Sequence, residues 1–162
     1  MQGGWRVRVG GPEDLEAVIA LERQIPEAPH WSAMDYAAIF GGGGVAGGAQ
    51  RRLFVAEGER GVLGFAVGEV VGGTGSGSEA WGELESVGVE PGARRCGVGR
   101  ALCEAVLAWC RNLHVAHVEL EVRSKSTGAI RLYESLGFRS VGSRFGYYSQ
   151  PADDAVLMRA VD

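Results

Sequence analysis

The sequence predicts an α+β fold, an α/β sandwich in which a mixed sheet carries helices on both faces. Three observations support this class. The chain has 162 residues and is 46% hydrophobic, which is enough for a substantial core. Segments with strand-like alternation and segments with helical periodicity follow each other in the order β-α-α-β-β-β-α-β-α-β-β. Neither an internal repeat nor a linker divides the chain, so we expect residues 1–162 to form a single domain.

The N-terminal part predicts one strand and two helices. Residues 6–9 alternate as a short strand. A proline and two acidic residues then open a helix over residues 12–23. Two further prolines end this helix, and Ser32 is the expected N-cap of a second helix that runs to about Phe40.

The middle of the chain predicts a hairpin followed by a third strand. Residues 52–57 and 62–71 are strand-like runs joined by a glycine-containing turn, which favours a hairpin. Residues 81–89 form the next strand, which ends at a Pro-Gly pair. Two glycine-rich segments, residues 41–48 and 72–77, are expected to be flexible loops because glycine loses the most backbone entropy on ordering.

The C-terminal half predicts helices that alternate with strands. The expected elements are a helix over 98–111, a strand over 115–122, a helix over 127–136, and strands over 138–141 and 155–160. The apolar residues of the first helix fall on one face. Gly137 is the expected C-cap of the second.

Composition excludes several classes of protein. There are 16 basic and 20 acidic residues, so the basic footprint of a nucleic-acid-binding protein is missing. No signal peptide and no apolar run of roughly 20 residues is present, so we expect a cytoplasmic location and no membrane association. The three cysteines, Cys96, Cys103 and Cys110, do not suggest disulfides or a metal site. We expect core packing for them.

The strongest chemical signal is a glycine-bearing turn between a strand and a helix. The strand ends with Val87-Gly88-Val89, and the turn reads Arg94-Arg95-Cys96-Gly97-Val98-Gly99-Arg100. Backbone N–H groups at a helix start attract anions, glycines allow close approach, and arginines add positive charge. The turn matches neither the P-loop nor the dinucleotide-binding pattern. It predicts a phosphate site, and the alternative is a helix start that merely has arginines beside it.

A second motif extends this interpretation. It reads Leu132-Tyr133-Glu134-Ser135-Leu136-Gly137-Phe138. Together the two motifs resemble the signatures of the GNAT superfamily of acetyl-CoA-dependent N-acetyltransferases, in the same order and spacing. Finer similarity to the RimI branch, the ribosomal-protein-alanine N-acetyltransferases, rests on Glu121-Val122-Arg123, His30-Trp31-Ser32, Arg144–Tyr148 and Asp154–Met158.

This resemblance implies a largely antiparallel central sheet and a cofactor site for acetyl-CoA. Val87, Gly88 and Val89 would pair with the pantetheine arm through their backbone. The residues of the turn, Arg94, Arg95, Cys96, Gly97, Val98, Gly99 and Arg100, would hold the pyrophosphate. Ser126 stands where the family usually has an asparagine that helps to bind the cofactor, and its single hydroxyl is a shorter donor.

The resemblance also implies the catalytic roles. Glu121 would accept the proton of the acceptor amine and Tyr133 would protonate the departing thiolate, with direct attack and no metal. The chemistry agrees, since an α-amine with a pKa of about 8 must lose a proton before it attacks. The alternatives are a solvated strand carboxylate for Glu121 and simple helix packing for Tyr133.

Four further residues have open roles. Glu83 and Glu85 could assist proton transfer, or they could be exposed strand carboxylates. Tyr147 and Tyr148 could shape the acceptor groove, or they could only cover the end of the sheet. The resemblance implies that the acceptor is a protein N-terminus, such as that of a ribosomal protein. A small amine and a non-catalytic acyl-CoA-binding module are the alternatives, and both a monomer and a homodimer are compatible with the sequence.

Overall fold

The computed structural model describes residues 4–26, 28, 31–40, 49–72, 79–149 and 151–161. The expected loop at 41–48, the one at 72–77 apart from Gly72, and His30 lie outside these residues. The strands are β1 (Trp5–Val9), β2 (Gln50–Gly58), β3 (Gly61–Val71), β4 (Trp81–Val89), β5 (His117–Arg123), β6 (Arg139–Tyr148) and β7 (Asp153–Val161). The helices are α1 (Leu15–Arg23), α2 (Ala33–Ala37), α3 (Val98–Asn112) and α4 (Thr127–Ser135), and η1 (Pro12–Asp14) and η2 (Pro91–Ala93) are 3-10 turns.

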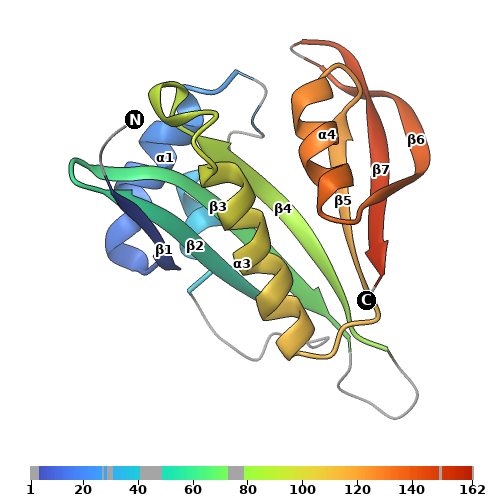
Figure 1. The fold of residues 1–162 in the computed structure, drawn as a ribbon, viewed down its shortest axis with the longest axis horizontal. Coiled ribbons are helices and arrows are strands. Elements are labelled where there is room, and N and C mark those ends of the chain that lie inside the picture. Colours follow the sequence, from blue (N-terminus) through green and yellow to red (C-terminus); the bar gives the residue numbers. More distant parts are fainter. Residues whose placement is uncertain are drawn as a thin grey trace.

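The strands form one seven-stranded sheet in the order β1-β2-β3-β4-β5-β7-β6 (Figure 1). Every neighbouring pair is antiparallel except β4 and β5, which are parallel. The predicted mixed and largely antiparallel sheet is therefore confirmed, and so is the order of strands and helices along the chain.

Helices cover both faces of the sheet, as predicted. On one face α3 and α4 pack over a core that includes Leu102, Val106, Leu120 and Phe138. On the other face α1 and α2 cover a smaller core built on Val18, Tyr36, Leu53, Val55, Phe65 and Val67. The central strands of the sheet are therefore packed between helices on both faces.

Local signals place the helix ends. The oxygen of the Ser32 side chain accepts a hydrogen bond of 3.1 Å from the Asp35 backbone N–H, so Ser32 is the N-cap of α2 as predicted. Gly137 has a φ of +101°, the left-handed conformation expected of the residue that follows α4. Its N–H donates to the carbonyl of Glu134 at 3.1 Å. The expected extension of the second helix to Phe40 is wrong, because α2 ends at Ala37.

The prediction of residues 138–141 as the sixth strand was too short. β6 continues to Tyr148 and stays paired with β7 through Ser143 and Arg144. Its register shifts twice, and both Gly142 and Gly146 lie at or within these irregularities. Glycines that weaken a strand signal in the sequence are the residues that such bulges use. β7 is also longer than expected and starts at Asp153.

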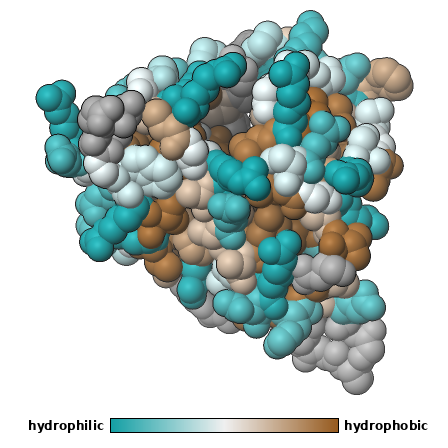
Figure 2. All heavy atoms as spheres, viewed as in Figure 1, coloured by the Kyte–Doolittle hydropathy of each residue, from teal (hydrophilic) through white to brown (hydrophobic). Residues whose placement is uncertain are grey.

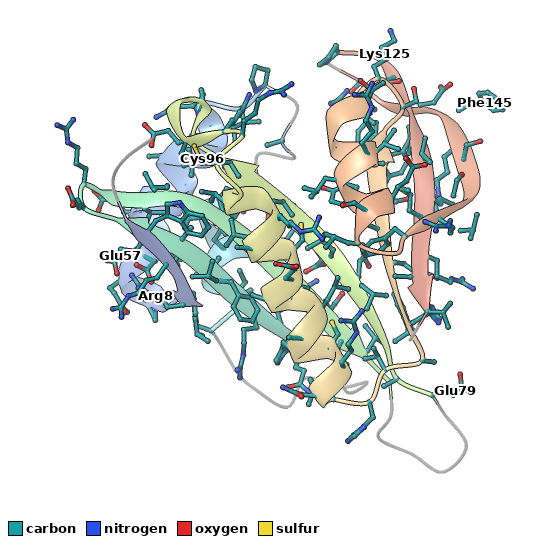
Figure 3. The ribbon with its side chains drawn as sticks, viewed as in Figure 1. Arg8, Glu57, Glu79, Cys96, Lys125 and Phe145 are labelled. Atoms are coloured by element: carbon teal, nitrogen blue, oxygen red, sulfur yellow. The ribbon has the colours of Figure 1, made fainter. Side chains whose placement is uncertain are left out.

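An arginine on β1 fastens the edge of the sheet to the turn that leads into α1. Nη1 and Nη2 of Arg8 each donate to one carboxylate oxygen of Asp14 at 2.9 Å, and Nε donates to Glu57 at 3.1 Å. Arg8 and Glu57 lie side by side across β1 and β2 in Figure 3. The guanidinium of Arg8 lowers the pKa of Asp14, which is otherwise raised by burial. This paired arrangement explains how a nearly buried carboxylate is tolerated there.

The cysteines behave as predicted. Cys103 and Cys110 are buried on α3, Cys96 is half-buried, and all three are free thiols. In the described part of the chain, no helix combines the length and the apolarity needed to cross a membrane.

Candidate active site

The two parallel strands at the centre of the sheet separate after a short paired stretch. β4 and β5 pair through Gly82 with Val118 and through Glu83 with Glu119, and then diverge (Figure 1). A cavity of about 490 Å³ lies where they have separated, and both strands and α4 contribute to its wall. The face seen in Figure 2 is hollowed at this end of the molecule. The divergence therefore opens a cleft in the middle of the sheet.

A β-bulge in β4 decides which side chains point toward α1 and α2. Val67 pairs with Ser86 and Gly68 pairs with Leu84, so Glu85 is the extra residue. Leu84 belongs to the core under α3, whereas Ser86 contacts Tyr36 on the opposite face. Bulges of this kind re-aim side chains beside functional sites.

The backbone of β4 turns polar groups that do not pair with β3 toward the cleft. The N–H of Glu90 donates to the carbonyl of Leu63 on β3 at 2.8 Å. Because backbone groups alternate between the two edges of a strand, those of Val87 and Val89 face β5 instead. Nε of Arg94 donates to the Val89 carbonyl at 3.2 Å, which agrees with this direction. An extended chain placed in the split could pair with Val87 and Val89.

Gly88 is required between these two valines. A Cβ atom at this position would lie 2.5 Å from Cε1 of Phe65 and 2.9 Å from Cδ1 of Ile25. No side chain fits there without displacing the ring of Phe65. Gly88 therefore serves the packing of β4, and only its backbone reaches the edge of the strand.

The turn before α3 has the conformation of an anion site. Arg95 has a φ of +61° and Gly97 a φ of +83°, so two residues of this short turn are left-handed. The N–H of Ala101 donates to Gly97, and the N–H groups before it have no partner within the helix. Such alternation of conformations turns successive N–H groups toward one point. A left-handed arginine is strained, and strain of this kind gathers at functional sites.

The other residues of the turn differ in their burial and contacts. Val98 is buried in the core, and Cys96 donates its thiol hydrogen to the Arg94 carbonyl at 3.5 Å. Figure 3 shows Cys96 directly before α3. A Cβ atom on Gly99 would meet Val89 at 3.6 Å and Leu132 at 3.7 Å, both ordinary contacts, so steric crowding does not demand glycine there. Arg100 reaches toward α4, where its Nη1 donates to the Ser135 hydroxyl at 2.8 Å.

Tyr133 and Ser126 lie on α4 and at its N-cap, and both line the cavity. Burial raises the pKa of Tyr133, and the nearby Cys103 and Tyr148 raise it further. The phenol is therefore protonated at neutral pH and can donate its proton. Its ring packs edge-on against Phe138, with ring centroids 6.0 Å apart.

Glu121 lies on β5 and lines the same cavity. Its Oε2 is 3.3 Å from Nε of Arg144, which β6 supplies. The pKa of Tyr147 is raised, chiefly by the charge of Glu121, so that hydroxyl also faces the carboxylate. Tyr148 lines the same cavity, and the guanidinium of Arg123 lies 4.3 Å from its ring centroid. The β6–β7 hairpin thus closes one end of the cleft.

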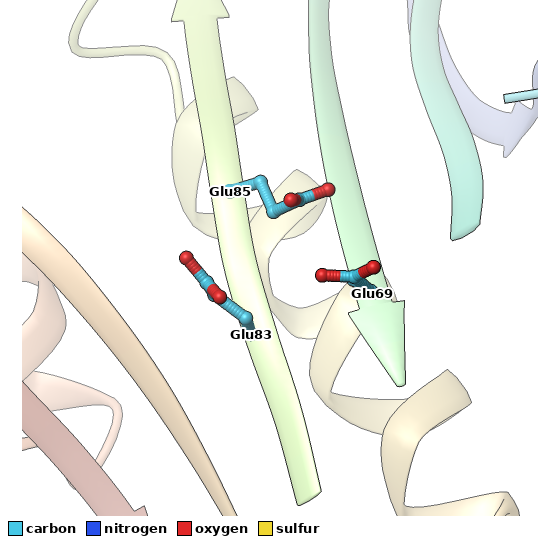
Figure 4. A group of neighbouring side chains, drawn as sticks. All are labelled: Glu69, Glu83 and Glu85. Carbon is cyan, nitrogen blue, oxygen red and sulfur yellow. The ribbon is translucent and has the colours of Figure 1, made fainter. Parts of the chain in front are cut away.

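Glu83 and Glu85 are not the exposed strand carboxylates that one alternative described. They form a group with Glu69 of β3, and one oxygen of each lies within 4.8 Å of the others (Figure 4). Arg51 neutralises two of the three, with its Nε 2.7 Å from Glu85 and its Nη2 3.3 Å from Glu69. No cation of the described residues forms an ion pair with Glu83. Burial, followed by the charges of Glu85, Glu69 and Glu121, raises the pKa of Glu83 to about 7.

The structure brings some of the predicted residues together and keeps others apart. Val87, Glu121, Ser126 and Tyr133 line one cavity. Gly88, Val89 and the turn at 94–100 do not line it, and η2 separates the turn from β4.

The sequence reasoning missed one wall of the cavity. Ile25, Pro26 and Ala28 line it from the segment after α1, and Ser86 lines it from β4. Pro26 signalled only the end of a helix. Because Ser86 faces the cleft through the bulge at Glu85, simple alternation along the strand could not have revealed it.

Comparison with protein families identifies a match. The model of the Acetyltransferase (GNAT) family matches residues 16–138, which is more than half of the chain. The [Ribosomal protein bS18]-alanine N-acetyltransferase of Escherichia coli is 40% identical over 77 residues, which cover 46% of this chain and 52% of that protein. The N-alpha-acetyltransferase RimI of Mycobacterium tuberculosis is 39% identical over 77 residues, 48% of this chain and 47% of that protein.

A different relative has another acceptor in its name. Mycothiol acetyltransferase of Acidothermus cellulolyticus is 46% identical over 72 residues, 44% of this chain and 22% of that protein. The aligned stretch thus spans about half or less of these relatives.

Solved structures agree over nearly the whole chain. The ribosomal-protein-S18-alanine N-acetyltransferase of Escherichia coli superposes with a TM-score of 0.75 at 26% identity, over 98% of this chain and 94% of that one. NAA60 of Arabidopsis thaliana in complex with acetyl-CoA gives a TM-score of 0.84 at 20% identity, over 98% of each chain. The second likeness concerns the fold alone.

Proposed function

Because the chain belongs to the GNAT family and is an N-acetyltransferase, we propose that it transfers acetyl from acetyl-CoA to the α-amine of a protein N-terminus. The observation that carries this proposal is the cleft between β4 and β5, where Glu121, Tyr133 and the free backbone of Val87 meet. Two relatives with about 40% identity over half the chain are named for α-amine acetylation. A ribosomal protein is the substrate that the Escherichia coli relative's name suggests.

Acetyl-CoA fits the donor side of the cleft. The backbone groups of Val87 and Val89 would pair with its pantetheine arm, as a further strand does. The left-handed turn at Arg95 and Gly97, with the N-terminus of α3, would hold the pyrophosphate. A solved structure of the same fold, NAA60, carries acetyl-CoA.

The acceptor side supplies the proton chemistry. Glu121 removes a proton from the acceptor ammonium, and the neutral amine attacks the thioester carbonyl. The N–H of Val87 is turned toward the split and stabilises the oxyanion that forms. The attacking nitrogen still carries a surplus proton after the attack, and this proton passes to water. As the C–S bond breaks, Tyr133 gives its proton to the thiolate, and the Tyr133 oxygen recovers a proton from water.

Glu83 is a second carboxylate that can take part in removing the proton of the acceptor amine. It and Glu121 both line a smaller cavity of about 230 Å³, and the charge of Glu121 contributes to the raised pKa of Glu83. A carboxyl with a pKa of about 7 can take the proton onward from Glu121 at neutral pH and release it to water.

Mass spectrometry of peptides incubated with the protein and acetyl-CoA tests the proposal. Peptides that begin with alanine or serine are expected to gain one acetyl group, and N-terminally blocked copies are the control. Acetylation of small amines without any peptide product would support the second candidate, a small-molecule acetyltransferase, which the mycothiol acetyltransferase likeness favours. Binding of acetyl-CoA with no turnover of either class would contradict both.

A further inference from the structure

One carboxylate oxygen of Glu121 is buried without a hydrogen-bond donor. No group in the described part of the chain donates a hydrogen bond to its Oε2. Such an oxygen is costly, because it has lost water and gained no donor in exchange. An acceptor ammonium brings three N–H donors and a positive charge, which are the groups that this oxygen requires.

The guanidinium of Arg144 lies beside that same oxygen. Nε of Arg144 is 3.3 Å from Oε2 of Glu121, and the contact is an ion pair without a hydrogen bond. An ammonium that approaches Oε2 to donate its hydrogens therefore meets a cation already next to it.

Arg144 reaches Glu121 across an intervening strand. β7 lies between β5 and β6, and its Leu157 pairs with Glu121 on one side and with Gly142 on the other (Figure 1). Arg144 is two residues beyond Gly142, so it lies on the same face of the sheet as Glu121. Gly142 has no side chain that would compete for the space over β7. The register of two strand pairs thus directs this arginine to the carboxylate.

The smaller cavity of about 230 Å³ is otherwise lined by acidic groups. Its three carboxylates belong to Glu83, Glu119 and Glu121, and Arg144 is the one cation among the described residues that line it. Arg159 of β7 is paired with Glu119 at 2.6 Å. The carboxylates attract an incoming cation and Arg144 repels it. Arg144 is therefore the group with which an ammonium has to exchange places.

The contact between Arg144 and Glu121 is easily broken. The side chain of Arg144 is 57% exposed, and ion pairs at such positions are weak. Its guanidinium carbon also lies 5.5 Å from the ring centroid of Tyr147. Arg144 can thus leave Glu121 and keep a cation–π contact.

We propose that Arg144 is a specificity-determining residue that holds the place of the acceptor ammonium at Glu121 and is exchanged for it when the acceptor binds. An acceptor with a cationic amine replaces one cation by another at the same carboxylate. A ligand without an ammonium leaves Arg144 on Glu121. The inference rests on the proposed function, because it takes Glu121 as the group that receives the amine.

Steady-state kinetics of Arg144→Gln at 0.15 M salt test the exchange. Without the competing guanidinium, the acceptor KM should fall roughly threefold, within the range that one exposed ion pair accounts for. The kcat should stay unchanged, because Arg144 has left Glu121 before the reaction. A merely structural arginine would give a higher KM, and an arginine that assists the base would give a lower kcat. Either result would overturn the proposal.

Two further variants serve as controls. Arg159→Gln removes the same charge from the same face, but its ion pair is with Glu119, so screening should keep the acceptor KM near the wild-type value. Arg144→Lys keeps a cation beside Glu121 and should also stay near wild type. Equal falls in KM for Arg144→Gln and Arg159→Gln would show a general effect of charge and would contradict the exchange.

Calorimetric binding of an alanine-initiated peptide in the presence of CoA gives a readout without turnover. Arg144→Gln should tighten binding of the free peptide roughly threefold and leave the inhibition constant of an N-terminally blocked copy unchanged. In a Glu121→Gln background the same substitution should have no effect on binding. Tightening of the blocked copy, or tightening that persists without Glu121, would overturn the exchange.

The same variants separate this inference from the proposed function. If only small amines are acetylated, and their KM falls in Arg144→Gln alone, the exchange is upheld and the protein N-terminus is rejected as the acceptor. If peptides are acetylated with the same KM in Arg144→Gln and wild type, the proposed function stands and the exchange is overturned.

Discussion

Tyr133 is the residue whose surroundings fit its proposed role most closely. It lines the cavity, and burial keeps its phenol protonated at neutral pH. Tyr133→Phe should lower kcat by roughly a hundredfold, the usual contribution of a positioned acid. Acetyl-CoA affinity measured by calorimetry should not change. Equal kcat values for the variant and the wild type would remove Tyr133 from the acid role.

Titration of Glu83 should make the folding stability of the protein depend on pH. Its pKa is raised from 4.5 to about 7, so the folded state holds this proton more tightly than the unfolded chain does. That stabilisation is complete below about pH 4.5 and is lost as the pH rises through 7. Glu83→Gln is always neutral, so its Tm should exceed the wild-type value by more at pH 8 than at pH 5. Glu59→Gln, an exposed change in the β2–β3 turn, is the control and should give a constant difference.

Individual residue types were predicted where a local motif specified them. The left-handed Gly137 follows from the C-cap signal at the end of α4, whereas the left-handed conformation of Gly97 was not predicted. The raised pKa of Glu83 does not follow from any local pattern, because it depends on burial in the sheet and on the carboxylates that β3 and β5 bring near it. Sequence alternation describes one strand and contains no information about its neighbours' charges.

At the scale of elements, the turn before α3 makes a direct prediction about Gly97. Its φ of +83° costs an L-residue about 1–2 kcal/mol, whereas a Cβ atom there would meet only Trp5 at 4.0 Å. Gly97→Ala should therefore lower the free energy of unfolding by about that amount and weaken acetyl-CoA binding. Gly92→Ala in η2 adds a Cβ atom that meets nothing within 4 Å, so its stability should stay close to wild type. Denaturant unfolding of both variants is the measurement, and equal losses would contradict the strain argument.

The elements themselves could largely be predicted, and their irregularities could not. The spacing of apolar residues predicted the bounds of α3 and β4 accurately, because each element buries one regular face. The bulge at Glu85 and the long, twice-shifted β6 depend on the register of partner strands. Register is fixed by tertiary packing, so no property of the single strand reveals it.

For the whole molecule, binding of acetyl-CoA should raise Tm. A ligand at a hundred times its Kd stabilises the folded state by about 2.7 kcal/mol, which is a shift of several degrees for a chain of this size. Arg95→Ala removes a charge from the turn and should reduce the shift measured by differential scanning fluorimetry. Arg60→Ala, an exposed change in the β2–β3 turn, should retain it. No shift in the wild-type protein would contradict the assignment of the donor side.

The cleft is a property of the whole sheet and was predicted only through family resemblance. Its two halves come from β4 and β5, which pair over two residue pairs and then separate. Glu121 and Tyr133 are 12 positions apart in the sequence, on β5 and α4, and both line this cavity. The wall formed by Ile25, Pro26 and Ala28 was not predicted at all, since these residues contribute by position and carry no catalytic group.

The most direct test of the account is tandem mass spectrometry that locates the acetyl group on an alanine-initiated peptide containing one internal lysine. The account predicts acetyl on the α-amine, a rate that falls at least tenfold in Glu121→Gln, and no product from a copy whose N-terminus is blocked. Acetyl on the lysine side chain, or an unchanged rate in Glu121→Gln, would contradict it.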